Sequence, residues 1–168
     1  FEKHLALARG CRDEIELRMA AIAERGVDLF DAQYQPIPGT DPARYRTGYD
    51  AAVEAELRPL LDRLGAAAGG TAYAVALDVN GYAPTHMTRC CDAPSGDPAH
   101  DLAQCRDRRI FDDPVSRRAA QNVQPFLLQS YKRDTGEFLA SLSLPIHVRG
   151  RHWGALCYAV KPELIEVG

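Results

Sequence analysis

The sequence predicts an α+β fold in which two long helices come first and an antiparallel sheet follows. Apolar residues recur at helical spacing over residues 1–70, and the spacing changes to strict alternation from Thr71 onwards. Turn signals such as Asn80-Gly81 and Arg149-Gly150-Arg151 then join one strand directly to the next. Helices followed by consecutive strands indicate an α+β fold and not the alternating units of a parallel sheet.

Composition limits the classes of partner. The 168 residues, 46% of them hydrophobic, suffice for one globular core, and the formal net charge of −3 argues against nucleic acid or an anionic membrane as main partner. No apolar run approaches the roughly 20 residues that span a bilayer, and no signal peptide is recognisable. Because the chain opens at Phe1 on a helical pattern, we expect residues 1–168 to be a single domain of a longer protein. This expectation leaves open whether that longer protein is membrane-associated.

The cysteines predict the redox environment of the domain. They are odd in number, and their spacing does not resemble a secreted disulfide framework (Cys11, Cys90, Cys91, Cys105 and Cys157). Adjacent Cys90 and Cys91 cannot easily bridge each other without strain. We therefore expect a reducing, cytoplasmic location.

Residues 1–26 are expected to form the first helix. Its apolar seam alternates steps of four and three, is interrupted by Arg12, and ends near Gly26, a suitable helix terminator (Phe1, Leu5, Ala8, Ile15, Met19 and Ile22). Two interpretations stay open. The helix either lies on the domain's own core, or continues an upstream coiled coil and helps to dimerise the protein and transmit its signal.

A connector and a second helix are expected over residues 27–70. Pro36, Pro38 and Gly39 stiffen the connector, and Asp41-Pro42 is a suitable helix start. Pro59 should kink or end this helix, because proline lacks a backbone donor. The helix would present one apolar stripe (Tyr45, Tyr49, Val53, Leu57, Leu60, Leu61 and Leu64).

Five strands are expected over residues 71–162. The first two form a hairpin that turns at Asn80-Gly81 and returns over 82–86, and the other three lie at 125–133, 138–148 and 152–160. Between them, the polar segment 88–125 is expected to cover the sheet as a loop with short helices near 98–104 and 114–122.

Four segments of the chain resemble a PAS-like, Cache-type sensory module of bacterial methyl-accepting chemotaxis proteins. They are LFDAQYQPIPGTDPARYRTGYD, ALDVNGYAPTH, CRDRRIFDDPVSRRAAQNVQPFLLQSYKRD and LSLPIHVRGRHWGAL, and the likeness extends from about Leu29 to Val160. The resemblance implies a PAS-like five-stranded sheet with N-terminal helices on one face and a cover of loop and short helices on the other. It also implies a dimeric, non-catalytic input module, joined through helices to a chemoreceptor signalling region in the same chain. Met87 departs from the pattern, since related sequences carry Asn there.

Ligand-binding residues are expected on the sheet face opposite its apolar stripe, beneath the cover. Of the arginines in CRDRRIFDD, Arg109 stands beside Ile110-Phe111 and is expected to turn inward and clamp a carboxylate. A solvated charged surface is the alternative. An apolar hollow with a few converging polar groups suits a small ligand, and the candidates for lining it are Tyr73, His86, Arg109, Gln129, Tyr131, Ser141, Ser143 and Trp153.

A metal- or haem-based redox or gas sensor is the alternative function. Its ligands would be His86, Cys90, Cys91 and Cys105, with His100 nearby. Their spacing matches no recurrent zinc signature, and there is no C-x-x-C-H motif for covalent haem, so the first expectation is that the domain uses no cofactor. A small hydrolase or isomerase is a third possibility, although no group is evident that would orient a Cys–His pair.

Overall fold

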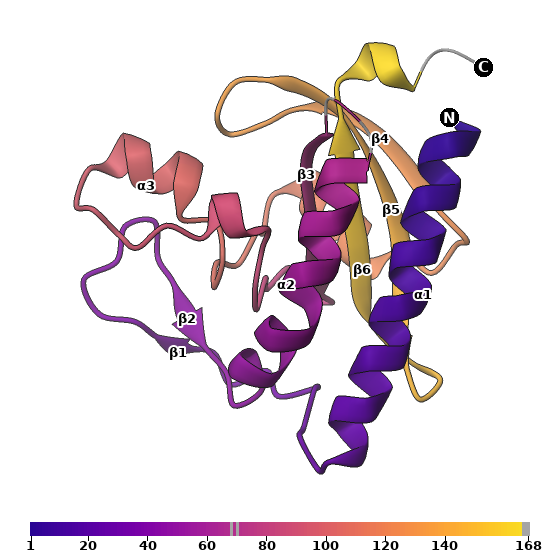
Figure 1. Cartoon of the computed structure of the whole chain (residues 1–168). Coiled ribbons are helices and arrows are strands. Elements are labelled where there is room, and N and C mark those ends of the chain that lie inside the picture. Colours follow the sequence, from indigo (N-terminus) through magenta and orange to yellow (C-terminus); the bar gives the residue numbers. More distant parts are fainter. Residues whose placement is uncertain (68, 70, 166–168) are drawn as a thin grey trace.

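The computed structural model describes residues 1–67, 69 and 71–165. Helices α1 (Glu2–Glu24) and α2 (Asp50–Ala67) lie beside one another against a four-stranded antiparallel sheet (Figure 1). The sheet has the order β3-β6-β5-β4, with bounds β3 (Thr71–Asp78), β4 (Leu127–Lys132), β5 (Phe138–Val148) and β6 (Arg151–Val160). The α+β class and the antiparallel sheet expected from the sequence are confirmed.

Several smaller elements accompany the two long helices and the four-stranded sheet. Strands β1 (Gln35–Pro36) and β2 (Tyr45–Arg46) form a separate ribbon, and 3₁₀ turns occur at Thr88–Cys90 and Pro162–Leu164. The cover contains α3 (Pro98–Gln104) and α4 (Pro114–Gln121), close to the two short helices expected there. No helix among the described residues is long and apolar enough to cross a membrane. Residues 68 and 70, at the end of the segment 27–70 expected to hold the connector and second helix, lie outside the described residues.

The apolar seam of helix α1 packs against other elements of the same chain. Ile15 and Met19 are fully buried, and the helix contacts both α2 and β5. Arg12, which interrupts the seam, donates to the carbonyl oxygen of Pro145 at 3.0 Å. Gly26 follows the helix at a φ of +84°, as expected for a residue that terminates it. Packing on the domain's own core thus accounts for the seam, and dimerisation through α1 stays a prediction.

Helix α2 begins later than the sequence suggested. Thr47 donates from its backbone N–H and its hydroxyl to the two carboxylate oxygens of Asp50, each at 2.7 Å. This resembles a capping box and fixes the helix start at Asp50. The expected start at Asp41-Pro42 is therefore wrong, and the preceding residues form β1 and β2. The helix also continues through Pro59 to Ala67.

The fifth strand of the expected sheet does not form. The turn at Asn80-Gly81 is present, but Ala83 then exchanges backbone hydrogen bonds with Arg108 and Arg109 instead of continuing along β3 (Ala83 N–H to Arg109 carbonyl 2.9 Å; Arg108 N–H to Ala83 carbonyl 2.7 Å). Pro84 has no N–H with which to extend a ladder. The segment 82–86 therefore leaves the sheet, and its Tyr82 packs in the helix-side core.

The two faces of the sheet pack differently. On the helix side, small Ala74 and Ala76 allow α2 to lie close, and they join a core that includes Leu142, Leu144 and Leu156. The opposite face carries a smaller cluster centred on Val75, Leu77 and Cys157, which packs against the alanines of α4. This second face is incompletely filled, and the candidate site lies there.

Candidate ligand-binding pocket

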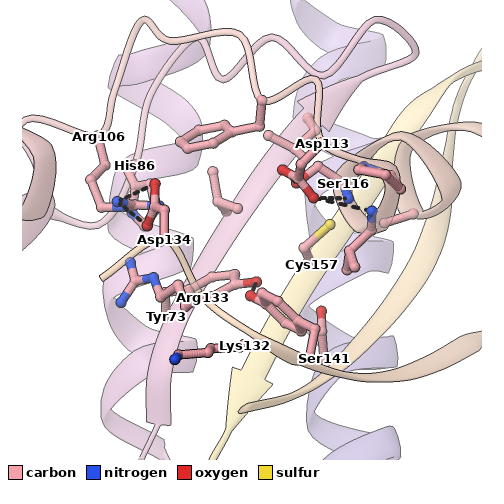
Figure 2. A pocket seen from close by; sticks show the side chains of 17 residues that line it. Tyr73, His86, Arg106, Asp113, Ser116, Lys132, Arg133, Asp134, Ser141 and Cys157 are labelled. Carbon is pink, nitrogen blue, oxygen red and sulfur yellow. Dashed lines mark hydrogen bonds and ion pairs between the residues drawn. The ribbon is translucent and has the colours of Figure 1, made fainter. Parts of the chain in front are cut away.

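A cavity of about 340 Å³ lies between the second face of the sheet and the cover (Figure 2). Its volume is at the lower end of the roughly 300–1,000 Å³ typical of small-molecule sites. Its apolar part is formed by side chains of β3, α4 and the segment between α3 and α4 (Val75, Leu77, Phe111, Pro114, Val115 and Ala119). Its polar groups gather mainly around His86 and the β4–β5 turn.

The N-terminal turn of α4 is fixed at the edge of this cavity by its cap. Asp113 accepts hydrogen bonds from the backbone N–H groups of Val115 and Ser116, at 3.1 and 3.0 Å, and Pro114 occupies the first helical turn. Gln129 of β4 reaches α4 from the sheet, donating to the Val115 carbonyl oxygen at 3.1 Å. The apolar side of α4 is therefore held over the sheet at a defined distance.

Two arginines at the polar end of the cavity share one carboxylate. Arg106 donates to Asp134 Oδ1 at 3.2 Å and Arg109 donates to Asp134 Oδ2 at 3.4 Å. Both guanidinium groups also donate to the carbonyl oxygen of Leu102, and both lie over the ring of Phe111. Arg106 is only 5% exposed, and its Nε is buried without a hydrogen-bond partner among the described residues. The positive charge of this pair is thus incompletely neutralised.

Arg133 adds a third guanidinium to the same end. It lies 4.9 Å from the ring centre of Tyr73, and its Nε is likewise buried without a described partner. Its nearest carboxylate, that of Glu137, is 3.9 Å away and more than half exposed. Burial and the neighbouring charge of Arg106 lower the pKa of Arg109, which indicates crowding of like charges. A bound anion would relieve this crowding.

His86 is the neutral hydrogen-bonding group of the site. Its Nδ1 accepts the backbone N–H of Met87 at 2.8 Å, so the neutral ring carries its hydrogen on Nε2. Burial, followed by the charges of Arg106 and Arg133, lowers the pKa of His86 well below the usual value. At neutral pH the ring is therefore an uncharged donor in the wall of the cavity.

Two tyrosines form the floor near the sheet edge. The hydroxyl groups of Tyr73 and Tyr131 are hydrogen-bonded to each other across the sheet. Burial raises the pKa of Tyr73 to about 12 and raises that of Tyr131 further, so both hydroxyls stay protonated at neutral pH. Ser141 of β5 lies beside them in the lining. This part of the site offers neutral donors and acceptors next to the guanidinium cluster.

The structure brings together half of the residues expected to bind ligand. Tyr73, His86, Tyr131 and Ser141 line the cavity. The remaining four lie elsewhere. Arg109 is outside the lining and donates to Asp134, and Gln129 is bonded to α4 and to Arg118. Ser143 donates to the sulfur of Cys157, and Trp153 packs in the helix-side core, where its indole donates to the Leu29 carbonyl at 2.8 Å.

Sequence reasoning missed the two arginines and the aspartate that gather at one end of the cavity. Arg106, Arg133 and Asp134 come from two segments that are distant in sequence and meet at one end of the cavity. Arg106 takes the place expected for Arg109 in the lining, and between them Arg108 has a φ of +63°. Arg108 itself points to Asp50 at 2.8 Å. The run of arginines indicated an inward cation, but the sequence did not show which of them borders the cavity.

The expected metal ligands are not assembled. Within residues 1–67, 69 and 71–165, no three His, Cys, Asp or Glu side chains are grouped so that they could hold a metal ion. The thiol of Cys91 donates to the carbonyl oxygen of Met87, that of Cys105 contacts Asp101, and His100 pairs with Asp92. The arrangement of His86, Cys90, Cys91 and Cys105 therefore gives no support to a zinc ion held by these side chains.

His86→Gln is expected to reduce the loss of stability on acidification. In the native protein the pKa of His86 is depressed, so the unfolded chain binds a proton below about pH 6.5 that the folded chain does not. Stability from this group is therefore full above that pH and falls by up to about 1.4 kcal/mol per pH unit below it. Urea denaturation between pH 7 and 5 measures this slope. An unchanged slope in the variant would contradict the buried, neutral state of the ring.

Comparison with known proteins gives one similar structure to report. No model of a known protein family matches the chain, and no curated protein matches it. Among solved structures, an extracellular ligand binding receptor from Desulfohalobium retbaense DSM5692 aligns with a TM-score of 0.45 and 15% identity. The alignment covers 97% of this chain and 25% of that one, so this chain spans about a quarter of the receptor's length.

This comparison corrects the expected location. The similar receptor is described as extracellular, which contradicts the cytoplasmic location expected from the cysteines, and that expectation is withdrawn. A likeness of this strength carries no conclusion about the ligand or the function. What the fold and the cavity define by themselves is an α+β domain with a ligand-sized hollow between its sheet and its cover.

Proposed function

We propose that this domain is a non-catalytic sensory module that binds a small carboxylate-bearing molecule in the cavity beneath α4. The observation that carries the proposal is Arg106, a guanidinium that is 5% exposed, borders the cavity and has a buried Nε without a described partner. A buried charge is costly unless it is paired and hydrogen-bonded. Asp134 pairs with the terminal nitrogens of Arg106 but leaves its Nε without an acceptor; a ligand carboxylate would supply one, and arginine's fork matches its geometry.

The rest of the lining suits an apolar body attached to that carboxylate. Val75, Leu77 and Val115 offer aliphatic contacts, and the ring of Phe111 faces the same space. Displacing water from such walls favours binding by about 25 cal/mol for each Å² of apolar surface that is buried. The hydroxyl of Ser141 and the neutral ring of His86 would select for polar substituents on the ligand.

We further propose that the parent protein is a chemoreceptor in which this module acts as a dimer. The family resemblance supports this proposal, as does the layout of the sheet, with helices on one face and the cover on the other (Figure 1). Strand β5 carries Ser141 on the cavity side and contacts α1 on the other, so it connects the site to the helices. A ligand that favours one arrangement of cover and sheet by about 1–3 kcal/mol would shift the helices and the signalling region attached to them.

A paired-ligand thermal-shift screen tests the proposed function. The probes are aliphatic and aromatic monocarboxylates, each measured beside its primary amide, for example hexanoate with hexanamide and benzoate with benzamide. The pairs share shape and apolar area and differ in charge, so we expect carboxylates to raise Tm and their amides to leave it unchanged. Equal shifts within every pair, or no shift with any carboxylate, would contradict the proposal.

Asp134→Asn is expected to tighten carboxylate binding by roughly 3- to 10-fold. Asp134 occupies Arg106 and Arg109 in the free protein and competes with an incoming carboxylate, and its side chain is about one-third exposed. Asparagine in its place would leave the positive charge of Arg106 and Arg109 unopposed. The expected gain in affinity corresponds to a charge-assisted hydrogen bond worth about 1 kcal/mol. Titration calorimetry with a carboxylate from the screen measures the effect. Weaker binding in the variant would mean that Asp134 helps to hold the ligand.

A further inference from the structure

Two cysteines face each other in the cover, next to the pocket. Cys91 and Cys105 are partners in an isolated antiparallel bridge. The flanking hydrogen bonds run from Asp92 N–H to the Gln104 carbonyl at 3.0 Å and from Arg106 N–H to the Cys90 carbonyl at 2.8 Å. This pattern defines a non-hydrogen-bonded pair, in which the Cα atoms are about 4.5 Å apart and the two side chains lie on the same side. A disulfide needs Cα atoms roughly 4.4–6.8 Å apart.

We propose that Cys91 and Cys105 form a disulfide that closes the loop carrying α3. The oxidant would be another disulfide, such as oxidised glutathione. One cysteine sulfur attacks it and displaces one thiol, and the second cysteine then displaces the other thiol as the new S–S bond forms. Each cysteine gives up its hydrogen, and the oxidant is reduced to two thiols. In the structure all five cysteines are free, which is the starting state of this reaction.

The other cysteines are poorly placed for this bond. Cys90 is adjacent in sequence to Cys91 but packs in the core on the helix side, where Cys11 of α1 also lies. Cys157 belongs to β6 on the floor of the cavity and contacts Ser143. Cys91 is partly exposed and Cys105 is buried, so an oxidant would first react with Cys91.

Burial makes the exchange slow in the folded protein. It raises the pKa of Cys91 to about 12 and that of Cys105 to about 11, so little thiolate is present at neutral pH. We therefore expect the bond to form mainly while the cover folds, before both thiols are buried. Once formed, it would resist reduction for the same reason.

The disulfide would also stiffen one wall of the pocket. Arg106 directly follows Cys105, and the thiol of Cys91 donates to the carbonyl oxygens of His86 and Met87 at 3.5 and 3.2 Å. The bond would thus tie together the two segments that carry His86 and Arg106. This consequence for ligand binding rests on the proposed function, whereas the bond itself does not.

Peptide mapping tests the pairing directly. The full chain is refolded with reduced and oxidised glutathione, its free thiols are blocked with iodoacetamide, and the protein is digested with trypsin. Cleavage after Arg89 and Arg106 places Cys90, Cys91 and Cys105 in one peptide. In a Cys90→Ser variant, we expect this peptide to be unalkylated and lighter by two hydrogens, and to take up two alkyl groups after reduction. Full alkylation without reduction would overturn the proposal, and so would a wild-type peptide in which Cys90 is protected and Cys91 alkylated.

Thermal unfolding of the refolded protein gives a second test that needs no ligand. Reduction of the wild-type disulfide is expected to lower Tm by roughly 5–10 °C, as for a closed loop of about 15 residues in a domain of this size. Cys105→Ser should abolish the effect of the reductant, and Cys157→Ser should retain it. If Cys105→Ser does not fold, peptide mapping of the wild-type chain still decides the question. Failure of these tests leaves the pocket proposal standing, because neither experiment involves a carboxylate.

Discussion

Arg106→Gln is expected to weaken carboxylate binding by roughly 10- to 150-fold. Hydrogen bonds to a charged group contribute about 1.5–3 kcal/mol each, and glutamine supplies one amide in place of a charged fork. Arg106 borders the cavity, whereas Arg109 is outside the lining and is bonded to Asp134 and Leu102. Titration calorimetry with one carboxylate from the screen, for both proteins, gives the ratio of Kd values.

A control variant with the same change in net charge distinguishes a contact with the ligand in the pocket from a long-range effect of the protein's charge. Arg18→Gln removes one positive charge from α1, where Arg18 pairs with Glu56 of α2 and is about half exposed. We expect this variant to bind the carboxylate as the wild type does, because the helices lie on the opposite face of the sheet. An unchanged Kd for Arg106→Gln, or an equal loss for both variants, would show that Arg106 does not contact the ligand.

Gly154→Ala is expected to destabilise the fold by roughly 3 kcal/mol or more. A Cβ atom at Gly154 would lie 1.9 Å from the carbonyl oxygen of Leu77 and 2.7 Å from the Cα of Asp78. Both are backbone atoms of β3, so relief requires β3 and β6 to separate. The hydrogen bond from the Val79 N–H to the Trp153 carbonyl oxygen, at 2.8 Å, joins the end of β3 to β6 and opposes this movement. Overpacking of well-filled interiors costs about 1–3 kcal/mol, and more where backbone must move.

Urea denaturation measures this loss, and a second glycine of the same chain provides the control. Gly10 lies within α1, and a Cβ there would meet nothing within 4 Å. Gly10→Ala should therefore stabilise the protein by about 0.5–1 kcal/mol, as expected for glycine replaced in a helix. A Gly154→Ala variant as stable as the wild type would contradict the pairing of Asp78 with Gly154 in the β3–β6 ladder.

Most of the secondary structure could be predicted because local patterns and tertiary packing agree. Alternation along β5 and the turn at Arg149-Gly150-Arg151 specified the β5–β6 hairpin, and Asp113-Pro114 marked the start of α4. The start of α2 and the missing strand at 82–86 were mispredicted because long-range pairing decides them. Ala83 bonds to a segment some 25 residues away along the chain, and no local signal indicates that partner.

The site could be predicted in part, because strand alternation is local, whereas contacts between distant segments are not. Tyr73, Tyr131 and Ser141 follow from strand alternation, which places them on one face. The side on which Trp153 lies could not be predicted in this way. The β5–β6 register shifts between Ile146 and His147, and alternation cannot be extended across the shift. Arg106 belongs to the cover, whereas Arg133 and Asp134 belong to the β4–β5 turn. Their proximity depends on the folding of the chain and cannot be read from a local pattern.

The most direct test of the central claim is a crystal structure of the protein with a carboxylate from the screen bound. We expect electron density for the ligand in the cavity beneath α4, with its carboxylate within hydrogen-bonding distance of Arg106 and its apolar body against Val75 and Phe111. A ligand bound elsewhere on the protein, or bound in the cavity with its carboxylate directed away from the guanidinium cluster, would contradict the account.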